Sequence, residues 1–297
     1  EALEWIRHVG MVKETVYTLY VTENRKLIGV LSILDLITAD EDDKIEDIME
    51  TNVISVDTLE DNEVVASMFS KYDFLALPVV DKENRIVGII TFDDVMDVIQ
   101  AEATEDFSKM AAVAPSEDEY FKTSVFAHAK NRIAWLLVLM LSATITGAIV
   151  NKYQAAFAAV PVLVSFLSML SGTGGNCGSQ TSAMIIRGMS IGEIKMKDFF
   201  KVLFKEFRIA IICGVILSVV NAARIILVYY NDPTVNCYQL ALTVSLAILA
   251  TVILSKLIAA ILPMLAKKLK IDPAVMAAPL ITTIVDTCSV MVFFMLA

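Results

Sequence analysis

The chain has 297 residues, 57% of them hydrophobic, and a formal net charge of −10. This hydrophobic fraction is too high for an ordinary soluble domain. Residues 1–124 hold 28 acids and 10 bases, a net charge of −18, whereas residues 125–297 hold 6 acids and 14 bases, a net charge of +8. We therefore expect an acidic soluble half followed by a membrane half. The acidic half excludes nucleic-acid binding, because it would repel phosphates.

An internal repeat lies in the soluble half. Residues 27–36 resemble residues 86–95, with an offset of 59. The matched pairs are Gly29 with Gly88, Ser32 with Thr91, and Asp35 with Asp94. Each copy predicts a strand, a charged turn, a second strand and a helix, with Ser32 and Thr91 at the helix N-caps. Such a repeat indicates duplicated units that pack together.

The repeat resembles a pair of cystathionine-β-synthase (CBS) domains. By this resemblance, residues 1–46 form a first CBS domain truncated at its start, and residues 47–100 form a complete second one. The chain begins at Glu1 instead of Met, so we expect that its natural N-terminus is missing. The resemblance implies an α+β cytosolic regulatory module, with ATP as a candidate ligand.

Residues 101–130 connect the two halves. Acidic residues such as Glu105 and Asp106 begin this segment, and Pro115 lies near its middle. The pattern predicts a connecting helix, a break at Pro115 and an amphipathic entry into the membrane half.

The membrane half, residues 131–297, contains five apolar stretches, each near the length of about 20 residues that a span requires. They cover approximately residues 133–150, 155–186, 199–230, 240–265 and 273–297. The fold class expected is therefore an α+β CBS pair followed by an all-α transmembrane domain of five helices.

Basic residues alternate between the two ends of these stretches. They precede the first stretch and fill the second and fourth connections, whereas the first connection holds only Lys152 and the third holds none. This asymmetry predicts a multi-pass protein of the plasma (inner) membrane, with a cytoplasmic N-terminus and an extracellular C-terminus.

Asp286 is the only acid in residues 279–297. A carboxylate at bilayer depth is costly, so such residues usually line a pathway or pair with another charge. We expect a cation path. The alternative is a structural ion pair with Lys256, although we expect the long side chain of Lys256 to extend toward the membrane surface.

A glycine-rich run at residues 171–180 interrupts the second stretch. Glycine opens the backbone, and Asn176 and Gln180 add amide oxygens, which favours a broken helix lining a cavity. The alternative is close helix packing through Gly174 and Gly178, which have Gly-xxx-Gly spacing.

The ligand types favour Mg²⁺. This ion prefers oxygen ligands and keeps much of its water, so a few carboxylates and carbonyls suffice. A two-fold dimer would supply two copies of Asp286. Asp272 and Pro273 predict a helix N-cap and first helical residue, a role compatible with a position at the pore mouth.

The sequence indicates neither a metal site built from cysteine or histidine nor a catalytic site. The four cysteines form no close-spaced metal pair, and the two histidines, His8 and His128, are isolated. We find no pairing of a nucleophile with a base, so we do not expect an enzyme.

The glycine-rich run, the Asp272-Pro273-Ala274 segment and Asp286 fourteen residues after Asp272 together resemble the MgtE family of magnesium channels. The resemblance implies a homodimer in membrane lipid, with a central Mg²⁺ pore and Asp286 as its selectivity carboxylate. The pore-lining residues that it implies are Gly172, Gly174, Gly175, Asn176, Gln180, Thr282 and Thr283.

The resemblance also implies gating by cytosolic Mg²⁺. Residues near 104–122 would form a plug helix, and Mg²⁺ would bridge acids of the CBS pair and plug to close the pore. The candidate ligands are Asp93, Asp94, Asp97, Glu102, Glu105, Asp106 and Asp272. The chain is expected to depart from the family in lacking the helical domain that normally precedes the CBS pair.

Two other hypotheses stay open. One is a proton-coupled transporter of another divalent metal, such as Mn²⁺ or Co²⁺, in which Asp286 also carries protons. The other is a membrane sensor in which the CBS pair is the active part.

Overall fold

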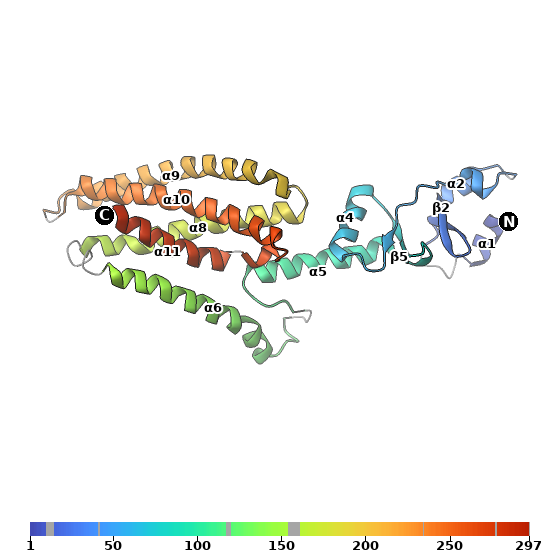
Figure 1. The fold of residues 1–297 in the computed structure, drawn as a ribbon, viewed down its shortest axis with the longest axis horizontal. Helices are drawn as coiled ribbons and strands as arrows, with labels where there is room; N and C mark the ends of the chain where they lie inside the picture. Colours follow the sequence, from blue (N-terminus) through green and yellow to red (C-terminus); the bar gives the residue numbers. More distant parts are fainter. Residues whose placement is uncertain are drawn as a thin grey trace. The chain divides into compact units, whose positions relative to one another are not determined.

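The computed structural model describes residues 1–9, 15–40, 42–116, 120–153, 161–233, 235–276 and 278–296. The chain divides into two compact units, Glu1–Ala103 and Thr104–Ala297, and Figure 1 labels most of their helices and some of their strands. Each unit has a buried hydrophobic core of its own.

The first unit contains two small β-sheets. Its elements are α1 (Ala2–Val9), β1 (Thr18–Glu23), β2 (Lys26–Ser32), α2 (Ile33–Thr38), α3 (Ile45–Ile48), β3 (Val56–Asp57), α4 (Asn62–Tyr72), β4 (Ala76–Val80), β5 (Ile86–Thr91) and the first part of α5 (Phe92–Met110). Strands β1 and β2 pair antiparallel. In the second sheet, β3 runs parallel to β4, and β4 runs antiparallel to β5.

The predicted repeat is confirmed by its helix caps. Ser32 caps α2: its hydroxyl accepts from the backbone N–H of Asp35 at 3.0 Å, and the Asp35 carboxylate accepts from the backbone N–H of Ser32 at 2.9 Å. The equivalent carboxylate, that of Asp94, accepts from the backbone N–H and hydroxyl of Thr91. At the start of both α2 and α5, an aspartate therefore accepts from the backbone N–H and the hydroxyl of a Ser or Thr three residues earlier.

The connecting helix is confirmed as the second part of α5, but it is shorter than the expected plug helix. It ends at Met110, where Ala112 adopts a left-handed φ of 55°. The N–H of Val113 then bonds the carbonyl of Ser108 at 2.9 Å, which closes the helix end. The plug helix predicted to run to residue 122 is therefore wrong beyond Met110, and residues 117–119 lie outside the described residues.

The second unit is built from five long helices among its described residues, which confirms the expected all-α membrane half. They are α6 (Val125–Lys152), α8 (Val164–Ser190), α9 (Phe199–Tyr229), α10 (Cys237–Lys268) and α11 (Ala278–Leu296), with short 3₁₀ turns η2 (Pro161–Leu163), η3 (Met196–Asp198) and η4 (Pro273–Met276). Four of these helical segments are long and apolar enough to cross a membrane. The fifth, α8, has 27 residues but is rich in glycine, serine and threonine.

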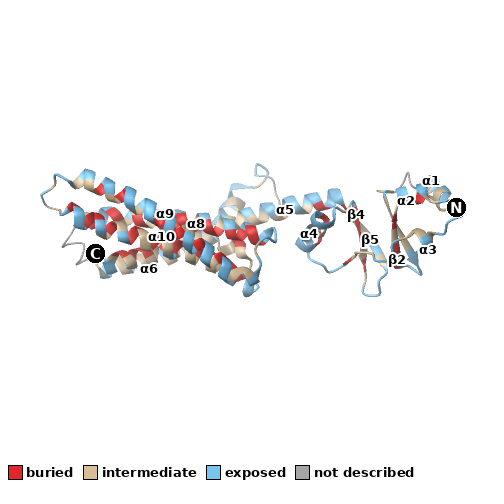
Figure 2. Cartoon of the chain, turned by 90° about the horizontal axis from the view of Figure 1, so that it is seen from above, coloured by how far each residue is buried: buried red, intermediate tan, exposed pale blue. Residues whose placement is uncertain are grey.

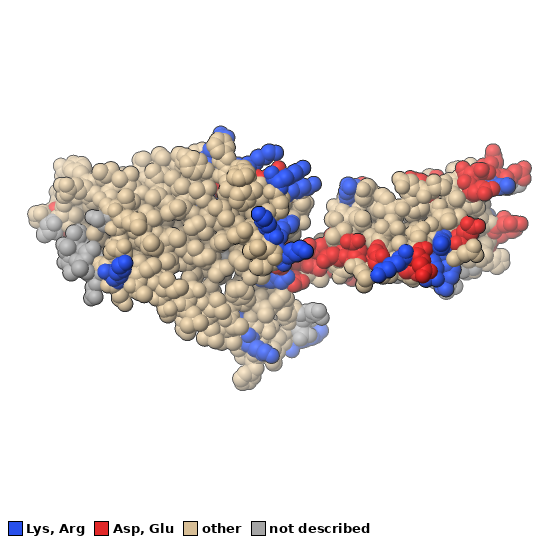
Figure 3. Space-filling model, in the orientation of Figure 1, with Lys and Arg blue, Asp and Glu red and all other residues tan. Residues whose placement is uncertain are grey.

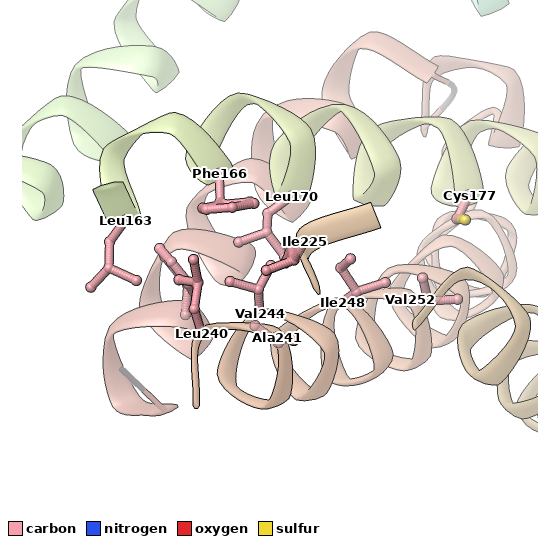
Figure 4. Close-up of a cluster of buried hydrophobic side chains, with 12 residues drawn as sticks. Leu163, Phe166, Leu170, Cys177, Ile225, Leu240, Ala241, Val244, Ile248 and Val252 are labelled. Atoms are coloured by element: carbon pink, nitrogen blue, oxygen red, sulfur yellow. The ribbon is translucent and has the colours of Figure 1, made fainter. Parts of the chain in front are cut away.

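Helix α10 lies at the centre of this unit and packs against α8, α9 and α11. Figure 2 shows the buried residues concentrated on α8 and α10. Figure 4 shows the largest cluster, in which Phe166 and Leu170 of α8 meet Ile225 of α9 and Val244 of α10. No residue of α6, which the structure describes in full, is buried. The outer helices therefore present apolar surface that suits lipid.

Candidate functional site

Asp286 lies near the middle of α11 and is half-buried. Its Oδ1 atom is buried and has no hydrogen-bond partner among the described residues. A buried polar oxygen without a partner is costly in any protein, and more so among apolar helices. Within the described residues, this oxygen of the Asp286 carboxylate is therefore left unsatisfied.

Lys256, the partner of Asp286 in the alternative interpretation, bonds elsewhere. The Nζ of Lys256 donates to the hydroxyl of Thr181 at 3.0 Å and lies 3.9 Å from the carboxylate of Glu206. The hydroxyl of Thr181 in turn donates to that carboxylate at 3.0 Å. All three residues are buried. They form a polar cluster that joins α8, α9 and α10.

This cluster corrects the expected position of Lys256 and adds Glu206 to the residues of interest in the membrane half. Lys256 does not extend toward the membrane surface, because an acid and a hydroxyl meet its ammonium group inside the unit. Glu206 was not selected from the sequence. The available signal was the one that marked Asp286: Glu206 is the only acid in the apolar segment Phe199–Tyr229.

The expected break at the glycine-rich run is wrong. Residues 171–180 are helical throughout, inside α8. A Cβ added at Gly174 would lie 2.8 Å from Thr251 and Val285, and one at Gly178 would lie 2.8 Å from Ile281 and Ser255. These glycines let α8 approach α10 and α11 closely, which is the packing alternative.

The hydroxyl of Ser255 reinforces this approach. It donates to the backbone carbonyl of Gly174 at 2.5 Å across the α8–α10 contact. The contact follows a pattern of small residues and interhelical hydrogen bonds that is typical of membrane helices.

A different face of α8 carries the exposed members of the run. Gly172, Asn176 and Gln180 are exposed and are spaced four residues apart, so they form one stripe along the helix. Gly175 is buried, and a Cβ there would lie 2.9 Å from Thr282 of α11. The predicted pore-lining residues thus divide between a helix contact and an exposed polar stripe.

The two predicted pore threonines, Thr282 and Thr283, lie in the first half of α11. The hydroxyl of Thr283 donates to the carbonyl of Pro279 at 3.0 Å, within its own helix. Thr282 lies four residues before Asp286, so both lie on one face of α11. Thr283 lies three residues before Asp286, so both threonines lie on the side of α11 that carries the carboxylate.

Three of the predicted acids converge at the other end of the unit. The Nζ of Lys109 lies 2.5 Å from the carboxylate of Glu105 and 2.6 Å from that of Asp272. The Asp106 carboxylate accepts from the hydroxyl of Ser190 at 3.3 Å. Asp272 also accepts from the backbone N–H of Ala274 at 2.8 Å, which confirms the predicted cap at the start of η4.

The charges of this cluster shift two pKa values. Burial, and then the negative charge of Asp272, raise the pKa of Asp106 above its ordinary value. Burial acts to lower the pKa of Lys109, but hydrogen bonds to Asp272 and Glu105 outweigh it and raise the pKa. The acids thus favour the charged form of the Lys109 ammonium group.

The other predicted metal ligands lie in the first unit, on α5. Asp93 and Asp97 are exposed, Glu102 is partly buried, and the carboxylate of Asp94 is occupied by the cap at Thr91. Among the described residues, no group of three or more His, Cys, Asp or Glu is arranged to hold a metal ion.

Comparison with family models matches residues 167–296 to MgtE, a divalent cation transporter, and residues 45–101 to the CBS domain. The chain belongs to the MgtE family. Its family is one of transporters and not of enzymes, as the sequence predicted.

Relatives of this MgtE chain align along its whole length. It is 38% identical to the magnesium transporter MgtE of Bacillus subtilis (strain 168), covering 100% of this chain and 64% of the relative. It is 35% identical to the magnesium transporter MgtE of Thermus thermophilus, covering 100% of this chain and 65% of the relative. The chain thus spans somewhat less than two thirds of these curated relatives.

A solved structure resembles part of the chain. The cytosolic domain of the Mg²⁺ channel MgtE, in complex with ATP, is 47% identical over 33% of this chain and 40% of that chain, with a TM-score of 0.32.

Proposed function

We propose that this MgtE chain conducts Mg²⁺ across a membrane along a path that includes the carboxylate of Asp286. The observation that carries the proposal is the buried Oδ1 of Asp286, which has no hydrogen-bond partner among the described residues. A hydrated Mg²⁺ ion needs few protein ligands, and carboxylate oxygen is the type it prefers. The magnesium transporters to which the chain is similar support this choice of ion.

The path forms between two copies of the chain. The stripe of Gly172, Asn176 and Gln180 is polar and exposed on a single chain, and polar groups facing lipid are costly. A second copy related by two-fold symmetry covers this stripe and brings two Asp286 carboxylates to one path. The basic connections favour a cytoplasmic N-terminus and an extracellular C-terminus.

Cytosolic Mg²⁺ closes the path by binding acids of the CBS pair and α5. Glu105 and Asp272 already share one ammonium group, that of Lys109, so these acids need a cation between them to remain close. Asp106 is the acid beside them. Asp93, Asp94, Asp97 and Glu102 are the further candidate ligands.

ATP is the proposed ligand of the CBS pair. The first unit contains a cavity of about 920 Å³, lined by α1 and the first sheet, with Trp5 and Tyr20 among its walls. This volume is within the range of small-molecule sites. Isothermal titration of the purified chain with ATP tests the proposal, and a Trp5→Ala variant that binds ATP equally well counts against this cavity.

Mg²⁺ flux into proteoliposomes tests the main proposal. We expect Asp286→Asn to abolish flux, while Glu193→Gln, which removes one exposed carboxylate, leaves it unchanged. Flux that requires a pH gradient would instead favour the proton-coupled transporter. Equal flux through wild type and Asp286→Asn would overturn the role of Asp286, and absence of flux in both would favour the sensor.

A further inference from the structure

A basic stripe lies at the start of α9, outside the proposed path. It consists of Lys197, Lys201, Lys205 and Arg208, which are exposed and three or four residues apart. Because η3 leads directly into α9, this spacing puts them on one face. Of these four basic residues, only Lys201 has a carboxylate of the described residues within ion-pair distance, that of Asp198 at 3.3 Å. The stripe therefore carries a large uncompensated positive charge.

The same face of α9 becomes apolar further along the helix. Ile212, Val215 and Val219 continue the spacing and are 61%, 46% and 63% exposed. Exposed aliphatic side chains on a membrane helix face acyl chains. The basic stripe ends with Arg208, one turn before Ile212, at the level where acyl chains give way to headgroups.

Aromatic side chains flank the stripe. Phe200 and Phe204 are 80% and 64% exposed, and the guanidinium of Arg208 lies 5.9 Å from the ring centre of Phe204. Interleaved basic and aromatic residues are typical of a surface that inserts its rings into the interface and directs its charges to headgroups. On the face drawn in Figure 3, the basic side chains of the helical unit gather mainly at one end.

We propose that the basic stripe binds the phosphate groups of anionic phospholipids, as a lipid site on the outer face of α9. The charge selects anionic lipids, because each basic residue near the surface favours them electrostatically. The adjoining apolar face selects a lipid over a soluble phosphate, because it accommodates the acyl chains of the same molecule. The competing occupant is the acidic half of the chain, with its net charge of −18.

The test measures retained lipid and needs no transport activity, so its failure and a failure of the transport proposal are distinguishable. The full chain is reconstituted in equal phosphatidylglycerol and phosphatidylcholine, extracted gently, and analysed by native mass spectrometry. We expect wild type to retain at least about fivefold more phosphatidylglycerol than phosphatidylcholine. Lys197→Gln, Lys201→Gln, Lys205→Gln and Arg208→Gln together should abolish this preference.

The matched control removes four basic residues near the start of α6 and the end of α10. These substitutions are Lys130→Gln, Arg132→Gln, Lys268→Gln and Lys270→Gln. The control should keep the preference. The proposal is overturned if the stripe variant, shown to be folded by its thermal transition, retains phosphatidylglycerol as wild type does, or if the control loses it equally. A different result would show that the acidic half occupies the stripe instead of lipid. In that case the stripe variant would lose protease protection of the first unit while its lipid retention stayed unchanged.

Discussion

Gly172 and Gly178 lie on the same helix, yet only one of them is required by packing. A Cβ at Gly178 would meet Ile281 and Ser255 at 2.8 Å, whereas nothing lies within 4 Å of one at Gly172. The difference arises because Gly178 faces the neighbouring helices and Gly172 lies on the exposed stripe.

Gly178→Ala should therefore destabilise the protein by about 1–3 kcal/mol through overpacking. Gly172→Ala should have no comparable cost, since its site is open. Thermal unfolding in detergent measures both. Equal shifts of the melting temperature would contradict the division of α8 into a packed face and an exposed stripe.

Tyr20 should make the first unit sensitive to alkaline pH. Its hydroxyl is buried without a hydrogen-bond partner among the described residues, and burial raises its pKa from 10.0 to about 12. Between these values the folded state keeps a proton that the unfolded state has lost. Stability contributed by this group is therefore lost as pH rises through the window.

Tyr20→Phe should reduce this alkaline loss and raise stability near neutral pH by about 1 kcal/mol, because it removes an unsatisfied hydroxyl. Urea unfolding at pH 8 and pH 11, followed by tryptophan fluorescence, measures the difference. Tyr17→Phe is the control, because Tyr17 is 65% exposed. The same pH dependence in both variants would refute the assignment to Tyr20.

At the scale of elements, a buried ion pair joins three helices of the membrane half. Removing one partner leaves the other charge buried and unpaired, which costs more than the pair itself contributes. Glu206 and Lys256, with Thr181 between them, therefore fix the packing of α8 against α9 and α10. Thr181 directly follows Gln180, so the cluster also orients the exposed stripe.

Lys256→Met alone should destabilise the chain by about 3–5 kcal/mol. Adding Glu206→Gln should recover much of that loss, because no unpaired charge remains. Thermal unfolding of both single variants and the double variant measures the coupling. Lys152→Met, at the exposed end of α6, is the control and should change stability by less than about 0.5 kcal/mol. Strictly additive effects would show that the two residues act independently.

The elements themselves were largely predictable. The two strand–turn–strand–helix copies and the five apolar helices follow from residue periodicity and length, which are local properties. The continuity of α8 was not predictable, because glycine permits both a broken helix and a closely packed one. The neighbours of Gly174 and Gly178 decide between these, and they come from α10 and α11.

At the scale of the whole molecule, the chain combines an acidic half that contains the CBS match with a basic membrane half. A net charge of −18 over residues 1–124 favours counter-ion binding. If specific acids bind Mg²⁺, the ion stabilises the folded chain by mass action in addition to general screening.

Mg²⁺ should accordingly raise the melting temperature more than NaCl at the same ionic strength. The excess should shrink in the double variant Glu105→Gln/Asp272→Asn, whose acids lie together in the structure. Glu60→Gln/Glu83→Gln removes the same charge from the first unit and serves as control. Identical melting curves in the two salts would argue against specific Mg²⁺ sites.

The sequence by itself determined the division into an acidic α+β module and a five-helix membrane half and the CBS repeat, and it selected Asp286 as the candidate pore residue. These follow from composition, spacing and the cost of a charge among apolar residues. The tertiary structure alone decided that Lys256 pairs with Glu206 and leaves Asp286 without a partner among the described residues. It also brought Asp272 to Lys109, 163 residues away. Partners of this kind depend on which helices adjoin and on which face each presents, and residue spacing along one helix does not specify that.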